Sequence, residues 1–257
     1  MSSAARLPGL SVFLPSHNEA GNVERVVRGF LAELPRVADE YEVIVVDDGS
    51  SDRTLEIARG LAASDTHVKV VHHELNRGYG GAVISGIRAA TMPYVLLADG
   101  DGQFDPADVG RLAARLATSS PCDVAVGRRV RRADPLIRRV NGRAWTILVR
   151  ALLGISINDI DCGFKLFRRD LLDGMELKAH GAMISTELMA RLAGRGAKIC
   201  EVDVGHLPRV AGEQSGASAK VVLRAFKELF VLFRELRAER RQAARDQRGK
   251  PRPGQRL

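Results

Sequence analysis

The chain has 257 residues, of which 45% are hydrophobic and 27% charged, a composition typical of a globular protein with one or two domains. This composition excludes wholesale disorder, and no run approaches the roughly 18 consecutive apolar residues of a membrane-spanning helix. The net charge of +8 is concentrated in residues 234–257, which hold nine Lys or Arg against three Asp or Glu. The basic character therefore belongs to a tail, and the nearly neutral body gives no indication of nucleic-acid binding.

The three cysteines, Cys122, Cys162 and Cys200, lie about forty residues apart and form no CxxC or Cys/His cluster. This spacing indicates neither a disulfide framework nor a zinc site. An odd number of cysteines is typical of a reducing compartment, so we expect three buried thiols. The N-terminal segment lacks the pattern of a secretory signal, and a cytoplasmic location is expected.

Strand and helix patterns alternate along the first hundred residues. Short β-rich runs are followed each time by polar turns and then by apolar residues at helical spacing. The predicted strands are 10–14, 41–46, 68–72, 94–98, 123–127 and 198–204, with 161–167 a strand or a turn. The predicted helices are 22–34, 51–61, 80–90, 105–116, 145–153 and 183–192. This order predicts an α/β fold with a mostly parallel, Rossmann-like sheet flanked by helices.

Acids, amides and glycines follow each of the first four strands, where ligands bind in α/β sheets. The clearest case is Asp99-Gly100-Asp101, because residues i and i+2 of an extended segment point to the same side. Two adjacent carboxylates suit Mg²⁺ or Mn²⁺, which are completed by substrate phosphates. A plain Asp-Gly turn is the alternative, and the acidic turns beside it favour the metal.

Two further turns carry candidate ligands. Asp47 and Asp48 repel one another unless a cation or hydrogen-bond donors lie beside them, although acids also favour the start of a helix. The turn Asn76–Gly81 lacks both the GxGxxG and the P-loop pattern. Two interpretations fit its glycines, Gly78 among them. They hold a phosphate at the start of a helix, or they simply allow close packing.

The motifs LPSHNE, VVDDGSSD, NRGYGGAVISG, ADGDGQFDP and DCGFKLFRRD occur in that order. Together they resemble the family 2 inverting glycosyltransferases of GT-A fold, in the branch of dolichol-phosphate mannose synthase and other polyprenyl-phosphate glycosyltransferases. The resemblance covers about residues 9–215. It implies a catalytic domain over 9–218, preceded by a tail (1–8). Beyond it, the spacing of apolar residues predicts an amphipathic helix over 219–246, and the composition of 247–257 predicts a disordered basic tail.

The resemblance also implies roles for individual residues. A nucleotide diphosphate sugar, GDP- or UDP-linked, would contact Pro15, Asn18, Glu19, Asp47, Asp48, Gly78, Asp99 and Asp101. Asp99 and Asp101 would bind the metal, with Gln103 close to metal and sugar. The phosphates of donor or acceptor would lie against Arg128, Arg129, Arg131, Lys165, Arg168 and Arg209. His17 and Cys162 stand where the family often has Tyr and Ser.

The expected activity is metal-dependent transfer of mannose or glucose to a polyprenyl phosphate, which is already ionised and needs no strong base. A soluble family 2 enzyme that acts on a hydroxyl is the alternative and does need a base. Glu187 is the first candidate and Asp161 the second. Glu187 could instead pair with Arg191 on the surface of its helix.

The C-terminal helix has one apolar stripe at 222, 226, 229, 233 and 236, with basic residues on its other faces. Three interpretations fit this pattern: docking on the catalytic body, pairing with a second chain in a homodimer, and binding to the cytoplasmic face of a membrane or to a membrane protein.

Overall fold

The computed structural model describes residues 6–117, 122–130, 136–179, 181–208, 226–239 and 241. The chain divides into two units, residues 1–215 and 216–257. In the first unit the helices are α1 (Val23–Val37), α2 (Thr54–Ser64), α3 (Gly78–Ala89), α4 (Val109–Ala117), α5 (Leu136–Leu153) and α6 (Met183–Gly194). The strands are β1 (Leu7–Ser16), β2 (Ala38–Asp47), β3 (Val68–His72), β4 (Tyr94–Ala98), β5 (Val124–Arg129), β6 (Phe164–Arg168) and β7 (Ile199–Val204).

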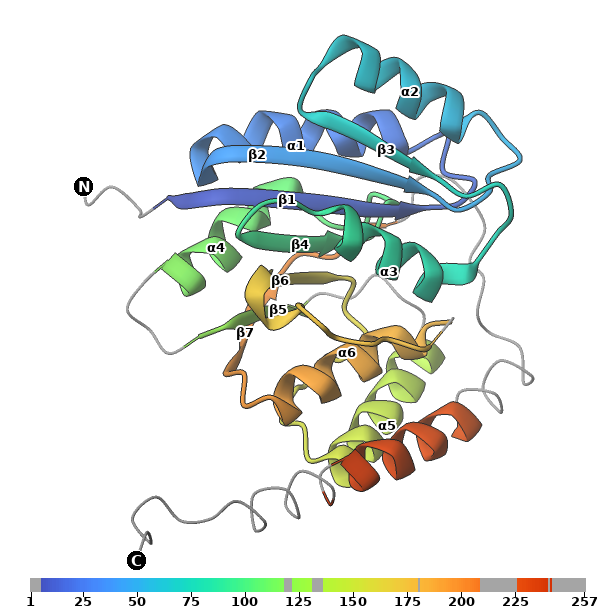
Figure 1. Ribbon diagram of the computed structural model, residues 1–257, viewed down its shortest axis with the longest axis vertical. Helices are drawn as coiled ribbons and strands as arrows, with labels where there is room; N and C mark the ends of the chain where they lie inside the picture. The colour runs from blue at the N-terminus through green and yellow to red at the C-terminus, as the bar shows by residue number, and fades with distance from the viewer. Residues whose placement is uncertain are drawn as a thin grey trace, which may run out of the picture. The chain divides into compact units, whose positions relative to one another are not determined.

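The seven strands form one sheet in the order β3-β2-β1-β4-β6-β5-β7 (Figure 1). All neighbouring pairs are parallel except those of β6, which runs antiparallel to both β4 and β5. The prediction of a mostly parallel α/β sheet flanked by helices is confirmed. The predicted strand or turn at 161–167 is a strand that begins at Phe164.

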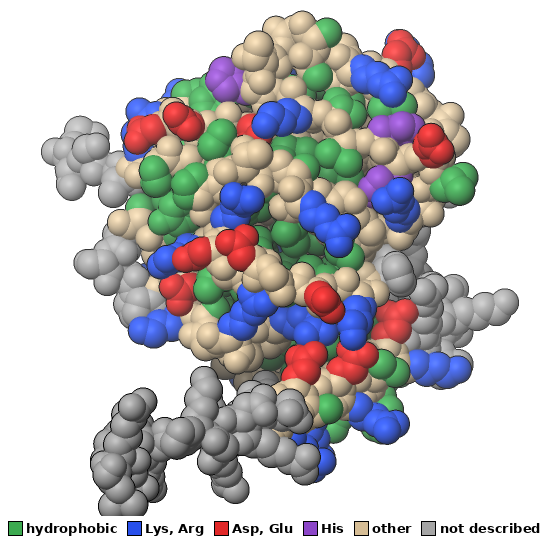
Figure 2. Space-filling model, viewed as in Figure 1, with side chains coloured by type: hydrophobic (Ala, Val, Ile, Leu, Met, Phe, Trp, Pro, Cys, Tyr) green, Lys and Arg blue, Asp and Glu red, His purple; other side chains and the backbone are tan. Residues whose placement is uncertain are grey.

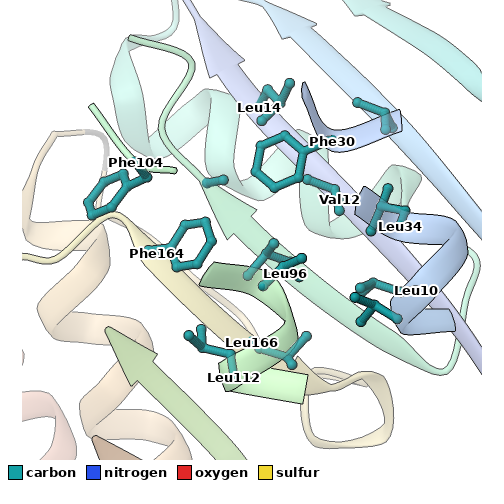
Figure 3. Close-up of a cluster of buried hydrophobic side chains, with 14 of the residues drawn as sticks. Leu10, Val12, Leu14, Phe30, Leu34, Leu96, Phe104, Leu112, Phe164 and Leu166 are labelled. Carbon is teal, nitrogen blue, oxygen red and sulfur yellow. The ribbon is translucent and has the colours of Figure 1, made fainter. Parts of the chain in front are cut away.

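The main core lies between the sheet and the layer formed by α1, α2 and α4. Figure 3 shows its centre, where Phe30 of α1 and Phe104 lie on either side of Phe164, with ring centroids 6.4 and 5.2 Å from that of Phe164. Alternate residues of the central strands face this layer, and the others face α3 on the opposite side of the sheet. Both faces are apolar, as expected for strands covered on two sides.

Two expectations are corrected here. The helix expected over 145–153 begins nine residues earlier, at Leu136, because its arginine-rich first half gave no apolar periodicity. Cys122 and Cys200 form a disulfide, with Cα atoms 5.9 Å apart, and only Cys162 among the three is a free, buried thiol. Burial raises the pKa of Cys162 to about 12. The pairing depends on β5 and β7 being neighbours, which the sequence spacing does not indicate.

The second unit contains a helix over 226–239, in which Arg234 and Arg237 lie over the rings of Phe230 and Phe233. This helix falls within the predicted amphipathic segment, and most of the remainder of 219–246 lies outside the described residues. Among the helices described, none is long and apolar enough to cross a membrane.

Candidate active site

Asp99 occupies the point where the buried strand β4 ends and meets the start of β6. Its backbone N–H donates to the carbonyl of Gly163 at 3.0 Å, and a Cβ at Gly163 would overlap the Asp99 carboxylate. The hydroxyl of Tyr79, from the first turn of α3, donates to Oδ1 of Asp99 at 2.7 Å. Two distant segments of the chain, at Gly163 and at the start of α3, therefore hold Asp99 in place.

The charge on Asp99 is unfavourable in the absence of a cation. Burial and, after it, the neighbouring charge of Asp101 raise the pKa of Asp99 to about 6, against the opposing effects of Tyr79, Lys165 and Arg129. Within the described residues, no group of three or more His, Cys, Asp or Glu side chains could hold a metal ion. Two carboxylates fit a divalent cation whose remaining ligands are phosphate oxygens and water.

The loop after Asp99 is held against the body of the fold. Gly100 donates its N–H to the carbonyl of Pro15 at 3.3 Å, and a Cβ there would lie 2.5 Å from Ser16 Oγ. The N–H of Gln103 donates to Oδ1 of Asp101 at 3.0 Å, and Phe104 packs in the core. The structure thus brings Pro15, Asp99, Asp101 and Gln103 together.

Gln103 also joins this loop to the segment that follows β7. Its side-chain amide donates to the carbonyl of Leu207 at 3.1 Å, and the N–H of Leu207 donates back to the Gln103 carbonyl at 2.8 Å. Arg209, which was expected to contact phosphate in this segment, lies outside the described residues, as does Arg131.

The turns after β1 and β2 are interlocked by polar side chains. Asn18 has a positive φ of 56°, and its Oδ1 accepts the N–H of Ser51 at 2.8 Å. Glu19 is turned inward: its side chain is buried and accepts the amide of Asn22 at 2.7 Å at the start of α1. Glu19 therefore supports the turn from within, whereas the resemblance implied a contact with the nucleotide.

Asp47 and Asp48 are each paired with a histidine from β3. Nδ1 of His72 lies 2.8 Å from Oδ2 of Asp47, and Nδ1 of His73 lies 2.7 Å from Oδ1 of Asp48. Neither histidine was predicted from the sequence. The neighbouring parallel strands β2 and β3 set this pairing, with Asp47 opposite His72.

Gly78 opens α3 with a φ of 77°, and its N–H donates to the side chain of Asn76 at 2.8 Å. The same N–H was a candidate phosphate donor, and in this structure it closes the turn. A positive φ explains why glycine occupies this position.

Two of the arginines expected to contact phosphates pair with aspartates of the protein itself. Arg128 pairs with Asp203 at 2.6 Å and remains near the surface. Arg129 is largely buried and binds both oxygens of Asp159 at 2.7 Å, so its guanidinium supports the fold. On the face that Figure 2 shows, basic and acidic side chains are interspersed.

Lys165 and Arg168 are both engaged by groups of the fold itself. Lys165 is fully buried; its Nζ donates to the Cys162 carbonyl and lies 3.4 Å from Ser185 Oγ. Burial lowers the pKa of Lys165, and the charge of Asp99 is among the effects that oppose this. Arg168 lies opposite the first residue of β4, at the other end of that strand from Asp99. Its side chain binds Asp170 at 2.7 Å.

The two candidate bases, Glu187 and Asp161, differ in their exposure to solvent. Glu187 is buried on α6, where Oε2 accepts the N–H groups of Lys178 and Ala179 at 2.9 and 2.8 Å, and Oε1 accepts Arg191 at 2.9 Å. The alternative pairing with Arg191 is confirmed, although the pair lies inside the protein. Asp161 is exposed, two residues before Gly163.

Known proteins provide three comparisons. Over 218 residues the chain is 30% identical to an undecaprenyl-phosphate 4-deoxy-4-formamido-L-arabinose transferase from Pectobacterium carotovorum, covering 84% of the chain and 65% of that protein. It is 34% identical over 208 residues to the glycosyltransferase AglD from Haloferax volcanii, covering 78% of the chain and 33% of AglD. The chain therefore spans about two thirds and one third of the lengths of these relatives.

A solved structure shares the fold. Glucosyl-3-phosphoglycerate synthase from Mycobacterium tuberculosis, in complex with UDP, superposes with a TM-score of 0.69 and 23% identity, covering 90% of the chain and 81% of that protein. The sequence profile of Glycosyl transferase family 2 matches residues 11–175, which include both acidic turns and Gly163. The chain belongs to glycosyl transferase family 2.

Proposed function

We propose that this chain transfers a sugar from a nucleotide diphosphate sugar to a polyprenyl phosphate, with Mg²⁺ or Mn²⁺ held by Asp99 and Asp101. The observation that carries the proposal is the Asp99–Asp101 pair, fixed at the carboxyl end of β4 beside the turns that would hold the nucleoside. The Pectobacterium relative is named for an undecaprenyl-phosphate acceptor. The M. tuberculosis synthase has been solved with Mn²⁺ and UDP-glucose.

Each part of the chain has a defined task in this reaction. Asp99 and Asp101 would hold the cation, which would supply positive charge to stabilise the diphosphate leaving group. The Tyr79 hydrogen bond keeps Asp99 in one orientation. The turns at Asn18 and Asp48 hold the nucleoside, and Gln103 lies next to Asp101.

The surroundings of Glu187 favour an acceptor that is already ionised. Both of its oxygens are engaged by donors of its own surroundings, so its carboxylate serves the loop at 178–179. A phosphate monoester needs no deprotonation near neutral pH, whereas a hydroxyl acceptor needs a base. Asp161 is the exposed carboxylate that could serve in that second case.

The test is a transfer assay with the purified chain, a panel of radiolabelled nucleotide sugars, Mn²⁺ and a polyprenyl phosphate. We expect label from one donor in the organic phase, and loss of that label in EDTA and in Asp101→Asn. Asp105→Asn is the matched control, because Asp105 lies in the same loop and caps the following turn at Ala107.

Transfer of label only to a water-soluble acceptor would contradict the proposal and favour the hydroxyl alternative. In that case Asp161→Asn should abolish turnover and leave donor binding intact.

A further inference from the structure

The two Asp–His pairs at the ends of β2 and β3 lie on opposite faces of the sheet. Consecutive residues of an extended chain point to opposite sides. Asp47 therefore lies on the side of Val43 and Val45, which belong to the core beneath α1. Asp48 lies on the side of α3, since its partner His73 contacts Ser85 of that helix at 2.8 Å.

The carboxylate of Asp48 has one occupied and one open oxygen. Oδ1 accepts from Nδ1 of His73 at 2.7 Å and from the N–H of Arg77 at 2.8 Å. No donor in the described part of the chain contacts Oδ2. His73 is itself buried, and a neutral imidazole with its proton on Nδ1 satisfies both Asp48 and the hydroxyl of Ser85.

We propose that His73 is a positioning residue that leaves only Oδ2 of Asp48 to face the donor's nucleobase, and that this geometry selects uracil over guanine. The inference rests on the proposed function. Uracil presents one N–H between two carbonyl groups, which a single carboxylate oxygen satisfies. Guanine presents two parallel donors, N1–H and the exocyclic amine, which match the two oxygens of a carboxylate. On Oδ2 alone both donors cannot be well aligned, so one of them loses a well-formed hydrogen bond.

Asp47 cannot supply the missing oxygen. Its carboxylate points to the other face of the sheet, and its Oδ1, although without a hydrogen-bond partner, is completely buried. The side-chain amides of Asn18 and Asn76 lie 3.4 and 3.2 Å from the ring of His17, which also contacts the backbone carbonyl of Asp48 at 2.9 Å. These amides are donors suited to the carbonyl groups of uracil.

Calorimetric titration of the full chain with UDP and with GDP, both in the presence of Mn²⁺, tests the inference. The wild-type chain should bind UDP more tightly by about tenfold or more, the effect of one unpaired buried donor. His73→Leu removes one of the two donors on Oδ1 and leaves the N–H of Arg77 in place, so Oδ1 can accept a donor of guanine and the ratio of the two Kd values should fall by about tenfold. His73→Asn keeps a donor near the position of Nδ1 and should restore most of the preference.

His67→Leu is the matched control. His67 also pairs with an aspartate, Asp65, at 2.8 Å, but it lies at the other end of β3, so its replacement should leave the ratio unchanged. If His73→Leu does not fold, as judged by circular dichroism, Ser85→Ala takes its place, and the ratio should fall by a smaller factor.

The outcomes distinguish a failure of the inference about His73 and uracil from a failure of the proposed function. Equal or tighter binding of GDP by the wild-type chain would overturn the uracil assignment and leave the transferase proposal intact. An unchanged ratio in the folded substituted chain would overturn the role of His73 alone. Binding of neither nucleotide would contradict the proposed function, and the inference with it.

Discussion

At the scale of single residues, Asp99 shows how a binding group is held in an unfavourable state. Its carboxylate is confined by Tyr79, Gly163 and the backbone of β6, next to a second carboxylate. The surrounding fold maintains this arrangement at a cost in stability, which a bound cation would offset.

Asp99→Asn should therefore stabilise the chain in EDTA. The pKa of about 6 lies above the value of 3.8 for an unperturbed Asp, so the ionised form costs about 1–3 kcal/mol of unfolding free energy at pH 8. The gain should be nearly complete above about pH 7, shrink as the pH falls through 6, and vanish below about pH 3, where the wild-type carboxyl is protonated in both the folded and the unfolded state. Denaturant titrations at pH 8, 6 and 3 measure it.

The exposed Asp39→Asn is the control and should change the unfolding free energy by less than about 0.5 kcal/mol. Equal unfolding free energies of wild type and Asp99→Asn at pH 8 would contradict the expected cost of the ionised Asp99 carboxylate.

Glu187 illustrates a residue whose surroundings decide its role. Glu187→Gln removes the charge opposite Arg191, which is nearly as buried, and should cost about 2–4 kcal/mol of unfolding free energy. Below the melting temperature, kcat should remain within about tenfold of wild type, because the group does not serve as a base. Thermal unfolding and a transfer assay measure the two effects separately.

Glu24→Gln gives the comparison, because Glu24 and Arg28 form the same i,i+4 pair on the exposed face of α1 and contribute little. A loss of kcat of about 10³-fold with unchanged stability would restore Glu187 as a base.

At the scale of elements, α3 lies close to β1 because Gly86 faces the ring of Phe13. A Cβ at this position would overlap that ring. The same helix supplies Tyr79 to Asp99 and Ser85 to His73, so its distance from the sheet sets the geometry of both parts of the site.

Gly86→Ala should lower the unfolding free energy by about 1–3 kcal/mol through overpacking. Gly60→Ala, in the middle of α2, should raise it by about 0.5–1 kcal/mol, since nothing lies within 4 Å of the new methyl group. Chemical denaturation of both variants tests the contrast. A stabilising Gly86→Ala would show that α3 can move away from β1 at no cost.

The elements also show what sequence patterns can reveal. The strands that end at Ala98 and Asp47 are apolar runs followed by acids, so the turns that carry Asp99 and Asp48 could be predicted. The antiparallel insertion of β6 between β4 and β5 could not, because strand order is set by long-range packing. For the same reason the burial of Lys165, the Arg129–Asp159 pair and the Asp48–His73 pair were not predicted.

At the scale of the whole molecule, the positive charge is concentrated at the C-terminal end of the sequence. Residues 234–257 carry most of the excess, and the helix over 226–239 exposes Phe230 and Val231. A chain that uses a polyprenyl phosphate must reach a bilayer, and apolar side chains beside Lys and Arg suit an anionic lipid surface.

The chain should therefore co-sediment with vesicles that contain anionic phosphatidylglycerol, and the bound fraction should fall as salt is raised from about 0.1 to 0.5 M. A Phe230→Ser/Val231→Ser chain should bind less, whereas the exposed Leu75→Ser, in the first unit, should bind as wild type does. Equal binding to neutral and anionic vesicles would contradict the electrostatic part of this prediction.

The single reversed strand has a consequence for how the chain is made. β6 pairs with β4 through residues synthesised about seventy positions later, whereas β1 to β4 pair among themselves within the first hundred residues. On the ribosome, β1 to β4 can assemble first, with the outer edge of β4 still open. Asp99 lies at the end of that edge, so its carboxylate acquires its final surroundings only when Gly163 arrives.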